Sequence, residues 1–75
     1  MGKGDTTVYI NVIVLQELDA SLLVQSDPDG DEFVVPMSQM REGSDVAVEG
    51  DTGVLALPRW LAEDREVEYR ETRDG

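Results

Sequence analysis

The stretch Thr7–Leu15, Thr-Val-Tyr-Ile-Asn-Val-Ile-Val-Leu, is the longest apolar run of the chain, and five of its nine residues are β-branched aliphatics. In a strand, side chains at every second position share one face. One face would then carry Val8, Ile10, Val12 and Val14, and the other Tyr9, Asn11, Ile13 and Leu15. Because one face is fully apolar and the other mostly so, we expect a central strand with something packed on each side.

Shorter apolar segments are expected to pair around this run. The predicted strands are Ala20–Gln25, Glu32–Val35, Val46–Val48 and Val54–Leu57, with Glu66–Arg70 as a candidate edge strand. Turn residues separate them at Ser26–Asp31, which combines Pro, Asp and Gly, and at Glu49–Gly53. Short strands at this spacing are typical of a small barrel or a sharply curved sheet. The sequence therefore predicts a mainly β fold, a small five- or six-stranded antiparallel barrel-like sheet with one short C-terminal helix.

Proline residues indicate two short helical segments. Pro36 has no N–H to donate to a sheet, so Pro36–Met40 is expected to form one helical turn. Pro58 suits the first position of a helix that ends near Asp64. Leu61 and Trp60 would be its buried contacts, because the chain has only four aromatic residues for its core. The alternative for Trp60 is an exposed anchor for a partner, since tryptophan is common in interface hot spots.

The length of 75 residues predicts one domain at 6–70, with flexible tails at 1–5 and 71–75. A core of this size supplies only about 3–5 kcal/mol of stability. The chain has no cysteine for a disulfide and no histidine for a general base. No apolar run reaches the ~20 residues of a membrane span, and the first residues lack the apolar core of a signal peptide. We expect a monomer or small homo-oligomer, and the absence of cysteine fits a reducing cytoplasm.

Two short motifs suggest chemistry, and each is better explained as a turn. Asp27–Glu32 alternates carboxylates as a calcium loop does, but its glycine is fourth rather than sixth, and Ser38 stands where that loop needs glutamate. Asp51-Thr52-Gly53 is the triplet of aspartic proteases, but Glu49-Gly50 precedes it where that pattern has apolar residues. We therefore expect no catalytic residues, no metal site and no cofactor.

Negative charge is the main compositional feature, because seventeen Asp and Glu face six Lys and Arg for a net charge of −11. Eleven of the acids form three clusters at predicted element ends, which could line one side of a barrel. The hairpin cluster is Asp27, Asp29, Asp31 and Glu32; the loop cluster is Asp45, Glu49 and Asp51; the helix-end cluster is Glu63, Asp64, Glu66 and Glu68. The acids outnumber the arginines locally, so direct binding of nucleic acid is disfavoured and a basic protein partner is favoured. A dispersed, solvated acidic surface is the alternative.

Three segments resemble a family of small uncharacterised proteins from phages and other mobile elements. They are Ala20-Ser-Leu-Leu-Val24, Phe33-Val-Val-Pro-Met-Ser-Gln-Met40 and Leu57-Pro-Arg-Trp-Leu-Ala62, about 19 of the 75 residues. That family often has tryptophan where this chain has Phe33, and lysine where it has Met37. The resemblance implies structural roles only for the matching residues, which are Phe33, Pro36, Ser38, Gln39, Pro58, Trp60 and Leu61.

The acidity is similar to that of a different group, the small anti-CRISPR proteins that mimic DNA, and this second likeness is compositional. It implies an anti-CRISPR-like inhibitor whose acidic clusters bind the basic nucleic-acid channel of a CRISPR-Cas effector and block target DNA binding. Such an inhibitor is expected in the cytoplasm of a bacterial or archaeal host. The alternative is a generic acidic protein-interaction domain without DNA mimicry, from a high-salt organism or with an antitoxin-like or phage-assembly role.

Overall fold

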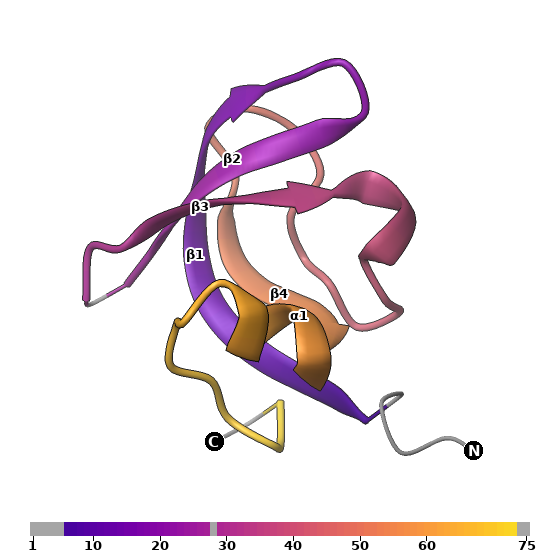
Figure 1. Ribbon diagram of the computed structural model, residues 1–75. Coiled ribbons are helices and arrows are strands. Elements are labelled where there is room, and N and C mark those ends of the chain that lie inside the picture. The colour runs from indigo at the N-terminus through magenta and orange to yellow at the C-terminus, as the bar shows by residue number, and fades with distance from the viewer. Residues whose placement is uncertain (1–5, 28, 74–75) are drawn as a thin grey trace.

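The computed structural model describes residues 6–27 and 29–73, so the tail expected at 1–5 lies outside the described residues (Figure 1). In chain order the elements are β1 (Thr7–Glu17), β2 (Ser21–Ser26), β3 (Glu32–Pro36), the 3-10 helix η2 (Met37–Gln39), β4 (Thr52–Pro58) and α1 (Arg59–Asp64). The strands form one antiparallel sheet in the order β3-β2-β1-β4. The predicted mainly β class, the helical turn after Pro36 and the C-terminal helix are confirmed.

Strand β1 has a neighbour on each edge, as its sequence predicts. Its N-terminal part pairs with β4, where Ile10 faces Leu55, and its C-terminal part pairs with β2, where Val14 faces Val24. The register shifts between Val14 and Gln16, and Figure 1 shows β1 as a long, curved strand. The curvature wraps the sheet around its own core, because an irregularity of this kind bends a strand.

The core lies on the concave side of the sheet. The face of β1 predicted to be fully apolar is buried there, and the predicted inward pairs of β2 and β3 are buried with it. These core residues are Val8, Ile10, Val12, Val14, Leu22, Val24, Phe33 and Val35. The other face of β1 is less covered, because Tyr9, Ile13 and Leu15 are half-buried and Asn11 is exposed. The expectation of packing on both sides of β1 is therefore met fully on one side only.

A loop covers the outer edge of β4, where the sequence predicted a strand at Val46–Val48. The backbone N–H of Arg41 donates to the Ala56 carbonyl at 2.8 Å, and that of Asp45 donates to the Val54 carbonyl at 2.7 Å. Between them the Ser44 hydroxyl accepts a bond from the Ala56 N–H at 2.9 Å. The strand predicted at Val46–Val48 is wrong, because the N–H groups of Ala47 and Val48 donate to the Asp51 carboxylate at 2.8 and 3.0 Å instead of to a neighbouring strand.

The predicted edge strand Glu66–Arg70 is reduced to a single bridge. Tyr9 and Arg70 exchange two backbone hydrogen bonds of 2.8 Å, and no longer ladder forms among the described residues. Glu66 has a φ of +58°, which turns the chain sharply after α1 and prevents an extended run from that point. The described sheet therefore has four strands rather than five or six, and it is a curved sheet rather than a closed barrel.

Helix α1 begins at Arg59, one residue later than predicted, because Pro58 is extended and ends β4. The helix packs Leu61 and Ala62 against the core. Trp60 is 46% exposed, whereas Leu61 is 1% exposed, so the predicted role of Trp60 in the core is wrong. Successive residues of a helix are about 100° apart, so a short helix that buries Leu61 and Ala62 turns Trp60 outward. At its C-terminal end the Arg65 Nε donates to the Val34 carbonyl of β3 at 3.0 Å, which ties the helix to the edge of the sheet.

Candidate functional site

The predicted acidic residues lie at the ends of elements, as the sequence suggests. The hairpin cluster occupies the β2–β3 turn and the start of β3, the loop cluster precedes β4, and the helix-end cluster lies in and after the last turn of α1. All eleven side chains are exposed except Asp51, which is half-buried. Exposure of this kind leaves the carboxylates accessible to a partner.

The edge of β1 that faces β2 is shared by two segments from distant parts of the chain. Strand β2 pairs with β1 as far as Val12, and the Asp27 N–H then donates to the Asn11 carbonyl at 2.8 Å. Two residues further back along the same edge, Tyr9 pairs with Arg70. The β2–β3 hairpin and the chain after α1 therefore approach each other along β1.

A pocket of about 140 Å³ lies where these two segments meet. It is lined by residues 9–11 of β1, by Ser26, Asp27 and Asp29 of the hairpin, and by residues 68–70. Three carboxylates, those of Asp27, Asp29 and Glu68, thus border the same hollow, together with the single cation Arg70. The sequence does not predict this meeting, because the two segments are about forty residues apart and only their shared pairing with β1 joins them.

The loop cluster lies along the opposite edge of β1. The Val14 N–H donates to the Asp51 carbonyl at 2.8 Å, and the Gly50 N–H donates to the Val14 carbonyl at 2.9 Å. The Glu49 N–H donates to the Glu17 carboxylate at 3.1 Å. None of the loop cluster lines the pocket. The described contacts thus bring Asp27 and Asp29 of the hairpin cluster to the same pocket as Glu68 of the helix-end cluster, and they hold the loop cluster at the other edge of β1.

The local structure shifts the pKa of one acidic residue, Asp51, and the pKa of Tyr69, which bonds to another acidic residue, Glu63. The pKa of the Asp51 carboxyl lies below its ordinary value, because the backbone N–H groups of Val48 and then Ala47 donate to its charged form. The hydroxyl of Tyr69 donates to Glu63 at 2.9 Å, and this bond to a carboxylate raises the pKa of Tyr69. The carboxylate of Asp51, the acid of the protease-like triplet, thus stabilises a turn.

Arginine side chains neutralise part of the acidic surface. Asp64 is paired with the adjacent Arg65, and Asp45 with Arg73 at 2.5 Å. The sequence shows arginines near the acids but does not reveal these pairs. Neither of these paired carboxylates is among the three that line the pocket, which are those of Asp27, Asp29 and Glu68.

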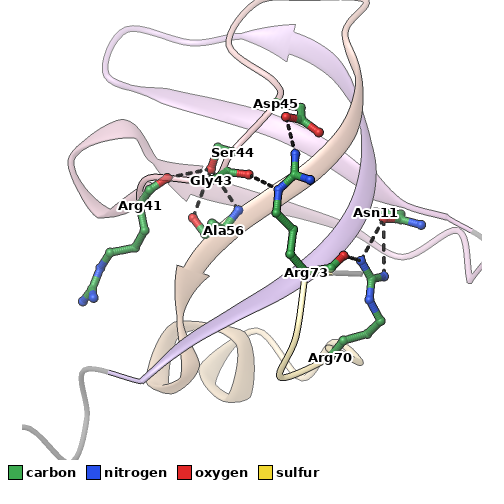
Figure 2. A network of polar contacts seen from close by, with 8 residues as sticks. All are labelled: Asn11, Arg41, Gly43, Ser44, Asp45, Ala56, Arg70 and Arg73. Atoms are coloured by element: carbon green, nitrogen blue, oxygen red, sulfur yellow. Dashed lines mark hydrogen bonds and ion pairs between the residues drawn. The ribbon is translucent and has the colours of Figure 1, made fainter. Parts of the chain in front are cut away.

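Arg70 and Arg73 form a clasp that holds the chain after α1 against the sheet, as Figure 2 shows. Both terminal nitrogens of Arg70 donate to the Asn11 side-chain oxygen at 3.3 Å, and one also donates to the Arg73 carbonyl at 2.8 Å. Arg73 in turn donates through Nε to the Gly43 carbonyl at 3.0 Å. The C-terminal boundary of the domain, which the sequence analysis placed at residue 70, therefore falls inside this set of hydrogen bonds. Residues 74–75 lie outside the described part of the chain.

The clasp was missed because its partners are far apart in the sequence. One signal was present, since Asn11 is the only amide within the apolar run Thr7–Leu15 and needs a polar partner there. No group of three His, Cys, Asp or Glu within residues 6–27 and 29–73 is placed to hold a metal ion. No helix in the same residues is long and apolar enough to cross a membrane.

No protein-family model, no curated protein and no solved structure matches this chain.

Proposed function

We propose that this protein is an acidic mimic of DNA that binds the basic nucleic-acid channel of a partner protein and blocks that channel. One observation supports the proposal above the others: a net charge of −11 is carried by a small domain in which Asp27, Asp29 and Glu68, from two of the acidic clusters, border one pocket beside β1. A concentrated field of one sign steers and orients partners of the opposite sign.

The dimensions of the domain agree with this role. Its principal extents are 34 × 25 × 21 Å. Duplex DNA as long as the greatest extent carries about 20 phosphate charges. The protein thus offers roughly half the charge of the DNA that would fill the same length of channel.

The partner class that we propose is a CRISPR-Cas effector. Such effectors hold their nucleic acids in positively charged channels and recognise much of them through backbone charge and shape. An acidic domain that occupies the channel would compete for the same lysine and arginine side chains. The proposal of a phage or mobile-element origin depends on the three sequence segments that resemble such a family.

Competition with duplex DNA tests the proposal. At low salt the protein is expected to reduce capture of target DNA by the effector, and the effect should weaken as salt is raised. The variant Asp31→Asn/Glu66→Gln removes one charge from each of two clusters and should weaken inhibition several-fold, up to about tenfold.

The matched control is Asp19→Asn/Glu42→Gln, which makes the same charge change at exposed residues outside all three clusters. It should inhibit almost as well as the unmodified protein. If the unmodified protein leaves DNA capture unchanged at low salt, the mimic is excluded. Equal losses in the two variants would show that net charge alone, rather than its placement, determines the effect.

The exposure of Trp60 favours a second candidate, a protein-interaction domain that binds through apolar contacts. Met37 and Val34 are also partly exposed, and Val34 belongs to the edge strand β3. An exposed tryptophan is a common centre of an interface. For this candidate, Trp60→Ala should abolish partner binding, whereas Asp31→Asn/Glu66→Gln should leave it intact.

A further inference from the structure

The turn that ends α1 has a glutamate where such turns usually have glycine. The Glu66 N–H donates to the Glu63 carbonyl at 3.1 Å, and the Val67 N–H donates to the Ala62 carbonyl at 3.2 Å. These bonds and the φ of +58° at Glu66 form a Schellman motif, in which that position favours glycine. Among residues 6–27 and 29–73, Glu66 is the only residue besides glycine with a positive φ. The turn is therefore strained, and opening the chain at Glu66 releases that strain.

Beyond this turn, residues 67–73 form a C-terminal segment that lies against the edge of β1. Val67 is 7% exposed and belongs to the core, and Arg70 makes one two-bond bridge with Tyr9. Exposed side chains supply the clasp of Arg70 and Arg73 (Figure 2). Strand β3, by contrast, pairs with β2 along its whole length. Because the C-terminal segment has few buried contacts and one bridge, it opens at a lower free-energy cost than a strand does.

The two outer edges of the sheet are already protected against pairing with another chain. The loop that contains Arg41 covers β4, where its N–H bonds to the Ala56 carbonyl. On β3, Pro36 has no N–H to donate, and the Arg65 Nε donates to the Val34 carbonyl. The edge of β1 that the C-terminal segment occupies is thus the place where an extended segment can be exchanged without displacing a strand.

We propose that two copies of this protein exchange their C-terminal segments, so that residues 67–73 of each copy pair with β1 of the other. Glu66 is the hinge, and a short hinge under strain favours such an exchange. The alternation over Glu66–Arg70, which predicts an edge strand, suits an extended segment once the turn at Glu66 is opened. Each contact of the segment is made again with the second copy, so the hinge and the charges decide the balance between the two forms.

Negative charge opposes the exchange, and salt should therefore promote it. The hinge lies within the helix-end cluster, so the exchange brings the cluster of one copy beside that of the other. Each copy also carries a net charge of −11. At 1 M salt the range of this repulsion falls to about 3 Å. We expect a monomer in dilute salt and an exchanged dimer at high salt and high protein concentration.

The oligomeric state of the full chain tests the proposal. The protein is refolded from urea at high concentration in 0.1 M or 1 M sodium chloride, and its mass is measured by light scattering after size exclusion. The dimer should be more abundant at 1 M. Glu66→Gly should weaken dimerisation about fivefold for each hinge, or roughly 25-fold for the dimer, because the strain is removed. Glu66→Val should strengthen it, because a β-branched residue tolerates a positive φ poorly.

The matched controls are Glu68→Gly and Glu68→Val, which remove the same charge at an exposed residue without a positive φ. They should leave dimerisation nearly unchanged, because residue 68 has the same contacts in both forms. Amide hydrogen exchange supplies a measurement on the monomer in case Glu66→Val does not fold. In Glu66→Gly the N–H groups of Tyr9 and Arg70, which bond across the bridge, should exchange about fivefold more slowly than in the unmodified protein.

A mixture of two single variants, Tyr9→Cys and Arg70→Cys, tests the exchange directly. The chain has no cysteine of its own, and bridged residues lie about 5.5 Å apart between Cα atoms, within reach of a disulfide. After the two are refolded together and oxidised, most disulfides should join one chain of each kind. The proposal is overturned by a protein that stays monomeric at 1 M salt, by dimerisation indifferent to residue 66, or by mixed disulfides no more abundant than random pairing gives. None of these outcomes bears on the DNA mimic, because no partner is present.

Discussion

Asp51 stabilises a turn through its carboxylate, which accepts bonds from the N–H groups of Ala47 at 2.8 Å and Val48 at 3.0 Å. Two residues later, Gly53 is required for a different reason. Its φ is +155°, and a Cβ there would lie 2.9 Å from the Cβ of Asp45. The loop before β4 therefore depends on the carboxylate of Asp51 and on the absence of a side chain at Gly53.

The lowered pKa of Asp51 makes its contribution depend on pH. Because the folded-state pKa lies below the ordinary value of 3.8, the contribution is complete above that value and is lost as pH falls through the folded pKa. We expect Asp51→Ala to lower the free energy of unfolding at neutral pH, and the difference from the unmodified protein to shrink in acid. Urea unfolding of both proteins across the acidic range measures this, and a difference independent of pH would contradict it.

Strand β4 depends on a side chain to complete its outer edge. The Ser44 hydroxyl lies 3.0 Å from the Arg41 carbonyl and 3.3 Å from the Ala56 carbonyl, and it accepts from the Ala56 N–H. We expect Ser44→Ala to lower the free energy of unfolding by about 1–3 kcal/mol, because a partly buried N–H loses its acceptor. Thermal or urea unfolding measures the loss.

The control for this prediction is Ser38→Ala in η2, an exposed position where the change should stay within about 0.5 kcal/mol. Faster hydrogen exchange of the Ala56 amide in Ser44→Ala would locate the effect at the edge of β4. Equal stability of Ser44→Ala and Ser38→Ala would mean that water replaces the hydroxyl at no cost.

The molecule as a whole carries eleven uncompensated negative charges on extents of 34 × 25 × 21 Å. Such charges repel one another in the compact state, and salt shortens the range of that repulsion from about 10 Å at 0.1 M to about 3 Å at 1 M. We expect sodium chloride to raise the free energy of unfolding by about 1 kcal/mol over this range. Urea unfolding at several salt concentrations, with sucrose as the uncharged comparison, measures the change.

The same measurement separates the proposed mimic from a domain adapted to high salt. A DNA mimic must be folded near 0.15 M salt, where it meets its partner, whereas a halophilic domain should lose its fold in dilute buffer. Stability that falls as salt is added would contradict the repulsion argument itself, because it would mean that the three ion pairs among the described residues outweigh the excess of acids.

The sequence by itself determined the features that depend on neighbouring residues. The alternation from Val8 to Val14 buried one face of β1, Gly30 with a φ of +81° turned the first hairpin, and Pro58 preceded α1. Each of these follows from the period of a strand or from the backbone freedom of one residue. The acidic clusters could likewise be placed at element ends from the sequence.

Only the tertiary structure decided which distant segments meet. It placed the Ser44 loop on β4 instead of a strand at Val46–Val48, turned Trp60 outward, and joined the hairpin to the chain after α1 at Tyr9 and Asn11. The two pairings depend on which segment reaches a free edge of the sheet, because an unpaired N–H or carbonyl bonds to whichever partner the folded chain brings to it. The direction of Trp60 depends on which side of α1 packs against the core. That competition is settled in space, so no periodicity in the sequence reveals it.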